Sequence, residues 1–176
     1  MTLVTPLFFP AQPLPPVEDH ADALKAAMRH VAATVSVITA GTQDRTGATV
    51  TSATALSVEP ATMIVNINRT SSSWPVIARH GHFCVNILQE SQQAIADRFA
   101  GKGGLKGAER YQDAEWTVLS SGAPVLADAL FAIDCVLEEA IERHSHAILI
   151  GRVVAVSGEG GTPLLYRQGQ YSGYKP

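Results

Sequence analysis

Residues 47–74 constrain the fold more than any other stretch, because they hold two strand-like runs joined by a Glu-Pro corner. The runs, residues 48–57 and 62–68, are rich in β-branched side chains, which favour strands. In the second run, Met63, Val65 and Ile67 point to one face of the strand, and Ile64, Asn66 and Asn68 point to the other. The sequence therefore predicts two strands here. Asn66 and Asn68 share the other face, which either contacts a ligand or is exposed to solvent.

The same stretch is unusually rich in hydroxyl groups, and it ends on the serine run Ser71, Ser72 and Ser73. One arginine, Arg69, and a single acid, Glu59, lie within it. Trp74 and Pro75 follow, and a proline in the first turn is typical of a helix start. Because free N–H groups and the helix dipole attract anions, the serine run predicts a site for a phosphate ester. The alternative is that the serines only cap the helix.

Composition narrows the class of protein. The 176 residues suggest one domain, and 46% hydrophobic against 16% charged residues suggests that a second subunit covers some apolar surface. A formal net charge of −3 without a basic stripe argues against a nucleic-acid-binding protein. No apolar run has the roughly 18 residues of a membrane span, and the N-terminal segment lacks a basic start, so we expect a cytoplasmic protein. Cys84 and Cys135 are expected as buried thiols.

The rest of the chain divides into a proline-rich arm, residues 1–17, and a single domain, residues 18–176. Propensity and capping patterns predict helices at 18–29, from 73 or 74 to 81, and at 92–100 with Ser91 as the N-cap. Alternating patterns predict further strands at 34–39, 83–88, 116–119, 147–156 and 163–167.

Residues 130–142 are ambiguous, because their composition favours a helix while their apolar residues alternate as in a strand. We favour a strand, with residues 143–146 as the tip of a hairpin. The total is then seven or eight strands with two or three helices and no regular alternation of the two. That arrangement favours a mainly β fold, an antiparallel barrel with helices packed outside it.

Several segments together resemble the flavin reductase family, the FMN-binding split-barrel proteins that supply reduced flavin to two-component monooxygenases. The matching segments are AAMRHVAATVSVITA, GATVTSATALSVEPATMIVNINRTSSSWPVI, FCVNIL, QQAIADRFA, AIDCVLEE, HAILIGRVVAV and PLLYRQGQY. They cover most of residues 24–174 in the order and spacing of the family. The block that ends in the serine run is the most specific of them.

The resemblance implies a six-stranded Greek-key split barrel, a homodimer, and FMN or FAD bound in a groove near the subunit interface. NADH or NADPH would donate a hydride, and a partner monooxygenase would receive the reduced flavin. We favour NADH slightly, because no basic cluster for a 2′-phosphate stands out. The cofactor-binding positions carried over are Thr49, Thr51, Ser52, Asn68, Ser71, Ser72, Ser73, Arg98, Phe99 and Tyr171. For the hydroxyls of the first strand the alternative is ordinary strand surface, and for Arg98 it is a solvated cation.

The family often carries a Gly-Asp-His turn that meets the nicotinamide, and the matching turn here reads His144-Ser145-His146. His146 is therefore the catalytic candidate, with orientation of the nicotinamide as its role, while Ser145 replaces the aspartate. No third ligand accompanies the two histidines in the sequence, so we expect no metal site. Two alternatives to a flavin reductase remain. One is a flavoprotein that keeps its flavin and reduces another acceptor, and the other is a non-catalytic flavin-binding module.

Overall fold

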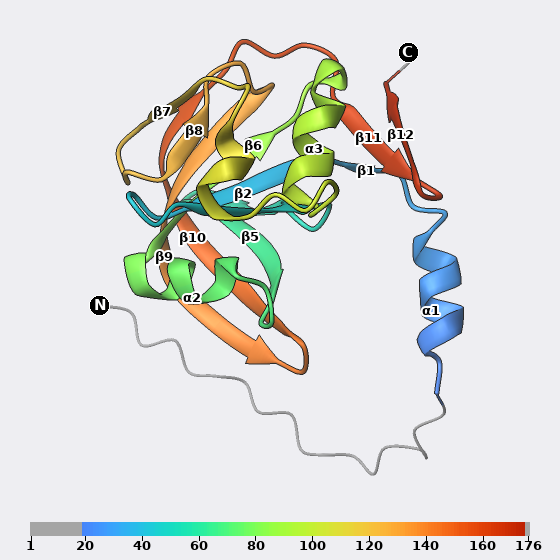
Figure 1. Cartoon of the computed structure of the whole chain (residues 1–176). Coiled ribbons are helices and arrows are strands. Elements are labelled where there is room, and N and C mark those ends of the chain that lie inside the picture. The colour runs from blue at the N-terminus through green and yellow to red at the C-terminus, as the bar shows by residue number, and fades with distance from the viewer. Residues whose placement is uncertain (1–18, 175–176) are drawn as a thin grey trace, which may run out of the picture.

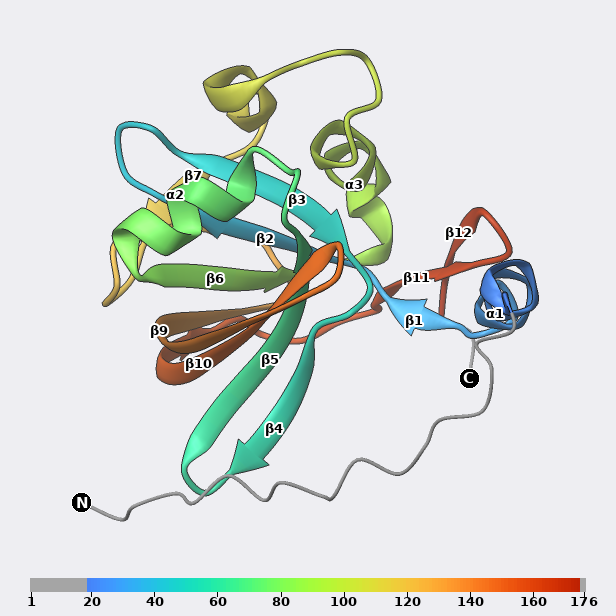
Figure 2. The same ribbon diagram turned by 90° about the horizontal axis from the view of Figure 1, so that it is seen from below.

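The structure, a computed structural model, describes residues 19–174, so the predicted arm at 1–17 lies outside the described residues. Its centre is a seven-stranded antiparallel sheet in the order β3-β2-β6-β9-β10-β5-β4 (Figures 1 and 2). The strands are β2 (Ser36–Ala40), β3 (Thr46–Val50), β4 (Thr54–Val58), β5 (Ala61–Asn68), β6 (His82–Ile87), β9 (Phe131–Arg143) and β10 (His146–Ser157). The prediction of a mainly β, antiparallel split barrel is confirmed.

The single strand expected at residues 48–57 is wrong, because the chain forms β3 and β4, which lie at opposite edges of the sheet. Figure 2 shows the curled sheet and the short crossing that leads from β3 into β4. Within that crossing the Ser52 hydroxyl takes the place of backbone, since it accepts a hydrogen bond from Asn66 N–H (3.3 Å) and donates to Asn66 O (3.2 Å). Counting β3 and β4 as one strand gives the six strands that the resemblance implied.

Two small sheets contain the strands predicted at 116–119 and 163–167, which are confirmed as β7 (Trp116–Val118) and β11 (Leu164–Arg167), together with three short strands that the sequence does not predict separately. One sheet is formed by β1 (Ala33–Thr34), β11 and β12 (Gln170–Gly173), and the other by β7 with β8 (Pro124–Leu126). The run predicted at 34–39 is interrupted at Val35. Its N–H donates to Leu164 O (2.9 Å) and its carbonyl accepts from Leu88 N–H (3.0 Å), so Val35 links the central sheet to the C-terminal strands.

The three predicted helices are confirmed as α1 (Ala21–Met28), α2 (Ser73–His80) and α3 (Gln93–Phe99). Gly81 ends α2 in the left-handed conformation, with a φ of 64°, as a glycine readily does. The expectation that Ser91 caps α3 is wrong. A 3₁₀ turn, Glu90–Gln92, precedes that helix, and the side chain of Gln92 accepts the N–H of Gln89 at 2.9 Å.

The ambiguous segment at 130–142 is a strand, β9, which pairs with β6 on one side and β10 on the other. Two neighbouring ladders satisfy its backbone, and this tertiary pairing outweighs the helix propensity of its residues. The hairpin tip between β9 and β10 falls at His144 and Ser145, with His144 at a φ of 50°. Cys84 and Cys135 are buried free thiols, as expected.

Candidate functional site

A groove of about 290 Å³ lies between the crossing from β3 to β4, the end of β5 and the tip before β10. It brings together six of the predicted site residues, namely Thr49, Thr51, Ser52, Asn68, Ser71 and His146. Ala48, Val50, Asn66 and Ile67 complete its lining. Residues nearly a hundred positions apart in the sequence thus meet because β5 pairs with β10 and sets His146 opposite Asn68.

The hairpin tip that carries His146 is held to the start of the serine run through Arg69. Its backbone N–H donates to Ser145 O (2.9 Å), and its guanidinium donates to His144 O (3.1 Å). The same guanidinium forms an ion pair with Glu142 at 2.5 Å. The one arginine of the stretch 47–74 therefore positions the histidine.

Two of the predicted hydroxyls serve the scaffold. Thr49 donates its hydroxyl hydrogen to Ala96 O at 2.6 Å, which joins β3 to α3. Ser52 uses its hydroxyl on the backbone of Asn66, as described above. Both residues line the groove, but their hydrogen-bonding capacity is directed into the protein.

Other polar groups remain available in the groove. Thr51 is exposed, and the Ser71 Oγ is buried without a hydrogen-bond partner within residues 19–174. Asn68 accepts both the N–H and the hydroxyl hydrogen of Thr70 at 2.9 Å on its Oδ1, which leaves its amide nitrogen as a donor. His146 pairs its Nδ1 with the Ser145 hydroxyl at 2.9 Å, so its Nε2 remains for a ligand.

The serine run divides between three environments. Ser71 lines the groove, whereas Ser72 lines a neighbouring cavity of about 370 Å³. Ser73 is buried, and its hydroxyl lies 3.3 Å from that of Thr46. Ser72 occupies the N-cap of α2 without a side-chain capping bond, so capping alone does not account for the serines.

Arg98 and Phe99 are not brought to the groove. The guanidinium of Arg98 donates to Gln112 O and to Asp113 Oδ2 (3.2 Å). Phe99 is buried in the core, with its ring 5.1 Å from that of Tyr111 in an edge-to-face arrangement.

Tyr171 lies beside the groove, in an adjoining cavity of about 270 Å³ that shares Thr49 and Thr51 with it. Its ring is 5.1 Å from that of Tyr166. Burial, together with the nearby Asp97 carboxylate, raises the pKa of Tyr171 to about 12, so its hydroxyl stays protonated at neutral pH.

Three cations that the sequence analysis missed surround Ser72 in the 370 Å³ cavity: Arg45, Lys106 and Arg110. Two come from the glycine- and lysine-rich segment between α3 and β7, and one from the turn between β2 and β3. Their spacing in sequence resembles no motif, and only the fold brings them together. Within residues 19–174, no cluster of three or more His, Cys, Asp or Glu side chains is arranged to hold a metal ion.

Comparison with known proteins agrees with this geometry. Residues 28–175 match the family described as "Flavin reductase like domain". The chain belongs to this flavin reductase family. It is 37% identical over 152 residues to "FMN reductase (NADH) RutF 2" of Methylorubrum extorquens (strain PA1), covering 86% of this chain and 87% of that protein.

Other relatives agree. The reductase subunit HsaB of a flavin-dependent monooxygenase from Rhodococcus jostii (strain RHA1) is 38% identical over 123 residues, 69% of this chain and 61% of HsaB. The crystal structure of a flavin reductase domain protein from Arthrobacter sp. FB24 superposes with a TM-score of 0.79 at 34% identity, covering 88% of this chain and 96% of that one. The family expected from the sequence, and the activity class that it implies, are confirmed.

The residues of the groove fit a flavin. Its lining offers donors at Thr51 and Asn68. The Ser71 Oγ, which has no hydrogen-bond partner among the described residues, lies at the end next to α2, where a phosphorylated side chain would leave the groove. None of the helices in the described part of the chain is long and apolar enough to cross a membrane.

Proposed function

We propose that this flavin reductase uses NADH to reduce FMN and passes the reduced flavin to a partner monooxygenase. The groove with free donors at Thr51, Asn68 and Ser71 carries the proposal. The relative in Methylorubrum extorquens is named for FMN and NADH, and HsaB is named as the reductase subunit of a flavin-dependent monooxygenase. FAD and NADPH are the alternatives for the two cofactors.

When bound, the flavin accepts a hydride from the nicotinamide, so the protein supplies binding and orientation. Thr51 and Asn68 would donate hydrogen bonds to the polar edge of the ring. Thr49 and Ser52 keep the groove wall in place through Ala96 and Asn66.

The hydrogen bond between the Ser145 hydroxyl and Nδ1 fixes the imidazole of His146, and leaves Nε2 for the groove. From there it would hydrogen bond the carboxamide of the nicotinamide and fix the distance between the two rings, which is where orientation contributes to the rate. Tyr171, in the adjoining cavity, would cover the nicotinamide from the side of β12.

We further propose a homodimer that works in the cytoplasm. None of the eight residues of α1 is buried, and Figure 1 shows this helix standing apart from the barrel. Leu24 of α1 is 62% exposed, and Val58 of the edge strand β4 is 82% exposed. A second subunit would cover such apolar side chains.

The test is nicotinamide oxidation by the purified protein, with NADH and NADPH each combined with FMN, FAD or no added flavin. We expect turnover that requires added flavin and is fastest with NADH and FMN. Turnover without added flavin would favour the flavoprotein that keeps its flavin. Flavin binding without any turnover would favour the binding module. Light scattering of the same sample tests the dimer.

A further inference from the structure

The cavity around Ser72 continues the groove toward the start of α2. Ser71 lines the groove and Ser72 the cavity, while Ala48 of β3 lines the groove and Thr46 the cavity. The two hollows therefore adjoin along both β3 and the serine run. A strand rises by ~3.3 Å per residue, so the chain from Thr46 to Thr51 spans about 16 Å. This span is of the order of the length of a flavin ring with its phosphorylated side chain.

The cavity is strongly cationic. Arg45 and Arg110 are half-buried and Lys106 is exposed. Arg45 lies over the ring of Tyr111 at 4.3 Å, and Arg110 donates to Leu105 O (2.9 Å) and Gly47 O (3.1 Å). Throughout residues 19–174, none of these three cations forms an ion pair with an acid. Their charges are thus available to an anion.

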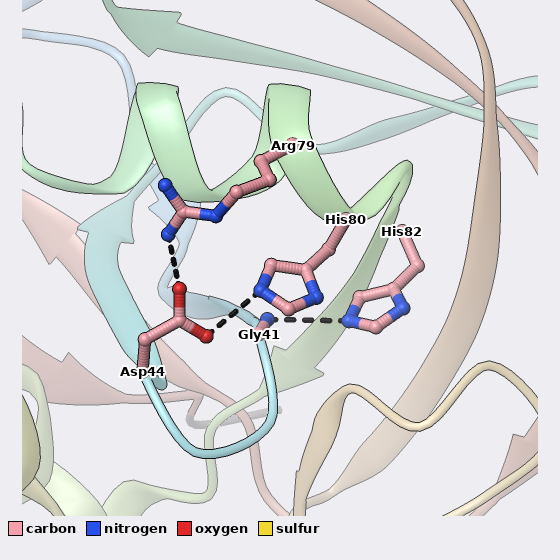
Figure 3. A network of polar contacts seen from close by, with 5 residues as sticks. All are labelled: Gly41, Asp44, Arg79, His80 and His82. Carbon is pink, nitrogen blue, oxygen red and sulfur yellow. Dashed lines mark hydrogen bonds and ion pairs between the residues drawn. The ribbon is translucent and has the colours of Figure 1, made fainter.

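Asp44 also lines the cavity, but its carboxylate is engaged elsewhere, as Figure 3 shows. One oxygen accepts from Arg79 and the other lies 2.8 Å from His80 Nε2, both near the end of α2. The bond from Arg79 holds the pKa of Asp44 below its ordinary value, so the carboxylate stays charged and paired with Arg79. The negative charge of Asp44 is therefore offset by Arg79 of α2, and not by the cations of the cavity.

We propose that Arg45, Lys106 and Arg110, with Ser72 and the start of α2, bind the phosphate group of the flavin. This proposal rests on the proposed function and deepens it, since it makes phosphorylated flavin the preferred substrate over riboflavin. A phosphate monoester carries close to two negative charges, which cations and a helix N-terminus stabilise. The buried oxygen of Ser71, at the junction of groove and cavity, gains a partner when the side chain of the flavin passes it.

The test compares the affinities of FMN and riboflavin, which differ only in the phosphate, by quenching of flavin fluorescence. Lys106→Gln is the first variant, because within residues 19–174 the Lys106 ammonium forms no hydrogen bond or ion pair, and the bond from Lys106 N–H to Glu109 uses the backbone alone. We expect FMN to bind about five- to tenfold more weakly and riboflavin to bind within about twofold of the wild type. Adding Arg45→Gln should enlarge the loss for FMN alone, and inorganic phosphate should compete with FMN but not with riboflavin.

Arg152→Gln is the matched control, since it removes the same charge from the exposed Arg152–Glu138 pair and should leave both affinities unchanged. Equal losses for FMN and riboflavin, or no loss for either, would overturn the phosphate site. A wild type that binds both flavins equally tightly would overturn it while leaving the proposed function intact. A wild type that binds neither flavin would overturn both.

Discussion

The hydroxyl of Thr49 donates to the carbonyl of Ala96 at 2.6 Å, whereas Thr51, two residues further along, is exposed and has no partner within the described residues. Both threonines line the groove, and both match flavin-contacting positions of the family. Their surroundings give them different tasks. Thr49 holds α3 against β3, and Thr51 is left to meet a ligand.

Replacing each threonine with valine separates these tasks. Thr49→Val leaves the Ala96 carbonyl without its donor, so the free energy of unfolding should fall by about 1–2 kcal/mol. Thr51→Val should leave that free energy within about 0.5 kcal/mol and weaken the binding of flavin. Urea denaturation and flavin titration of both variants measure the two effects. Equal losses of stability in the two variants would contradict this division.

His146→Asn should slow nicotinamide oxidation about tenfold or more, because the imidazole that orients the nicotinamide is lost. The affinity for flavin should stay within about twofold, since the donors at Thr51 and Asn68 remain. Steady-state rates and flavin titration provide the two readings. His144→Asn is the control, because His144 lies at the same hairpin tip but does not line the groove. The same rate in both variants would exclude a specific role for His146.

The sequence predicts most elements of the fold because alternation and helix starts are local signals. The break between β3 and β4 is not local. It depends on the curl of the sheet, which Figure 2 shows, and on the hydrogen bond from Ser52 in the crossing to Asn66 of β5. An uninterrupted run of alternating residues looks the same whether the chain stays at one edge or crosses to the other.

The candidate site was predictable in part. The residues of the groove lie on the block that most resembles the family, and β5 and β10 bring them together. Arg98 and Phe99 stand next to each other in sequence, yet one is held by Asp113 and the other is buried against Gly47. Which way a helical residue points depends on how its helix docks, and sequence alone does not carry that information.

Gly47→Ala should destabilise the fold because a Cβ there would lie 2.6 Å from Phe99 Cε1 and 3.0 Å from Ile38 O. Such overpacking costs about 1–3 kcal/mol. Phe99→Leu in the same chain should recover part of that loss, because the smaller side chain makes room, so the two changes should not be additive. Urea denaturation of the single and double variants tests this. Additive losses would show that Phe99 does not restrict the size of the side chain at position 47.

His82 is buried at the start of β6, and its Nε2 accepts the N–H of Gly41 at 3.2 Å (Figure 3). Burial lowers the pKa of His82, and the nearby His80 acts in the same direction. The carboxylate of Asp134 acts in the opposite direction without reversing the shift. Protonation of Nε2 would also cost the bond from Gly41, so the folded protein keeps this imidazole neutral.

Acid should therefore weaken the fold through His82. In the unfolded chain a histidine has a pKa of about 6.5, so below that pH the unfolded state binds a proton that the folded state does not. The free energy of unfolding should fall as the pH drops below about 6.5 and level off at the lowered pKa of the folded state. Urea denaturation at about pH 7.5 and at about pH 5.5 measures this fall in the free energy of unfolding. His82→Asn should be less stable at pH 7.5 but should lose less on acidification. An equal fall in both proteins would place the acid sensitivity at another group.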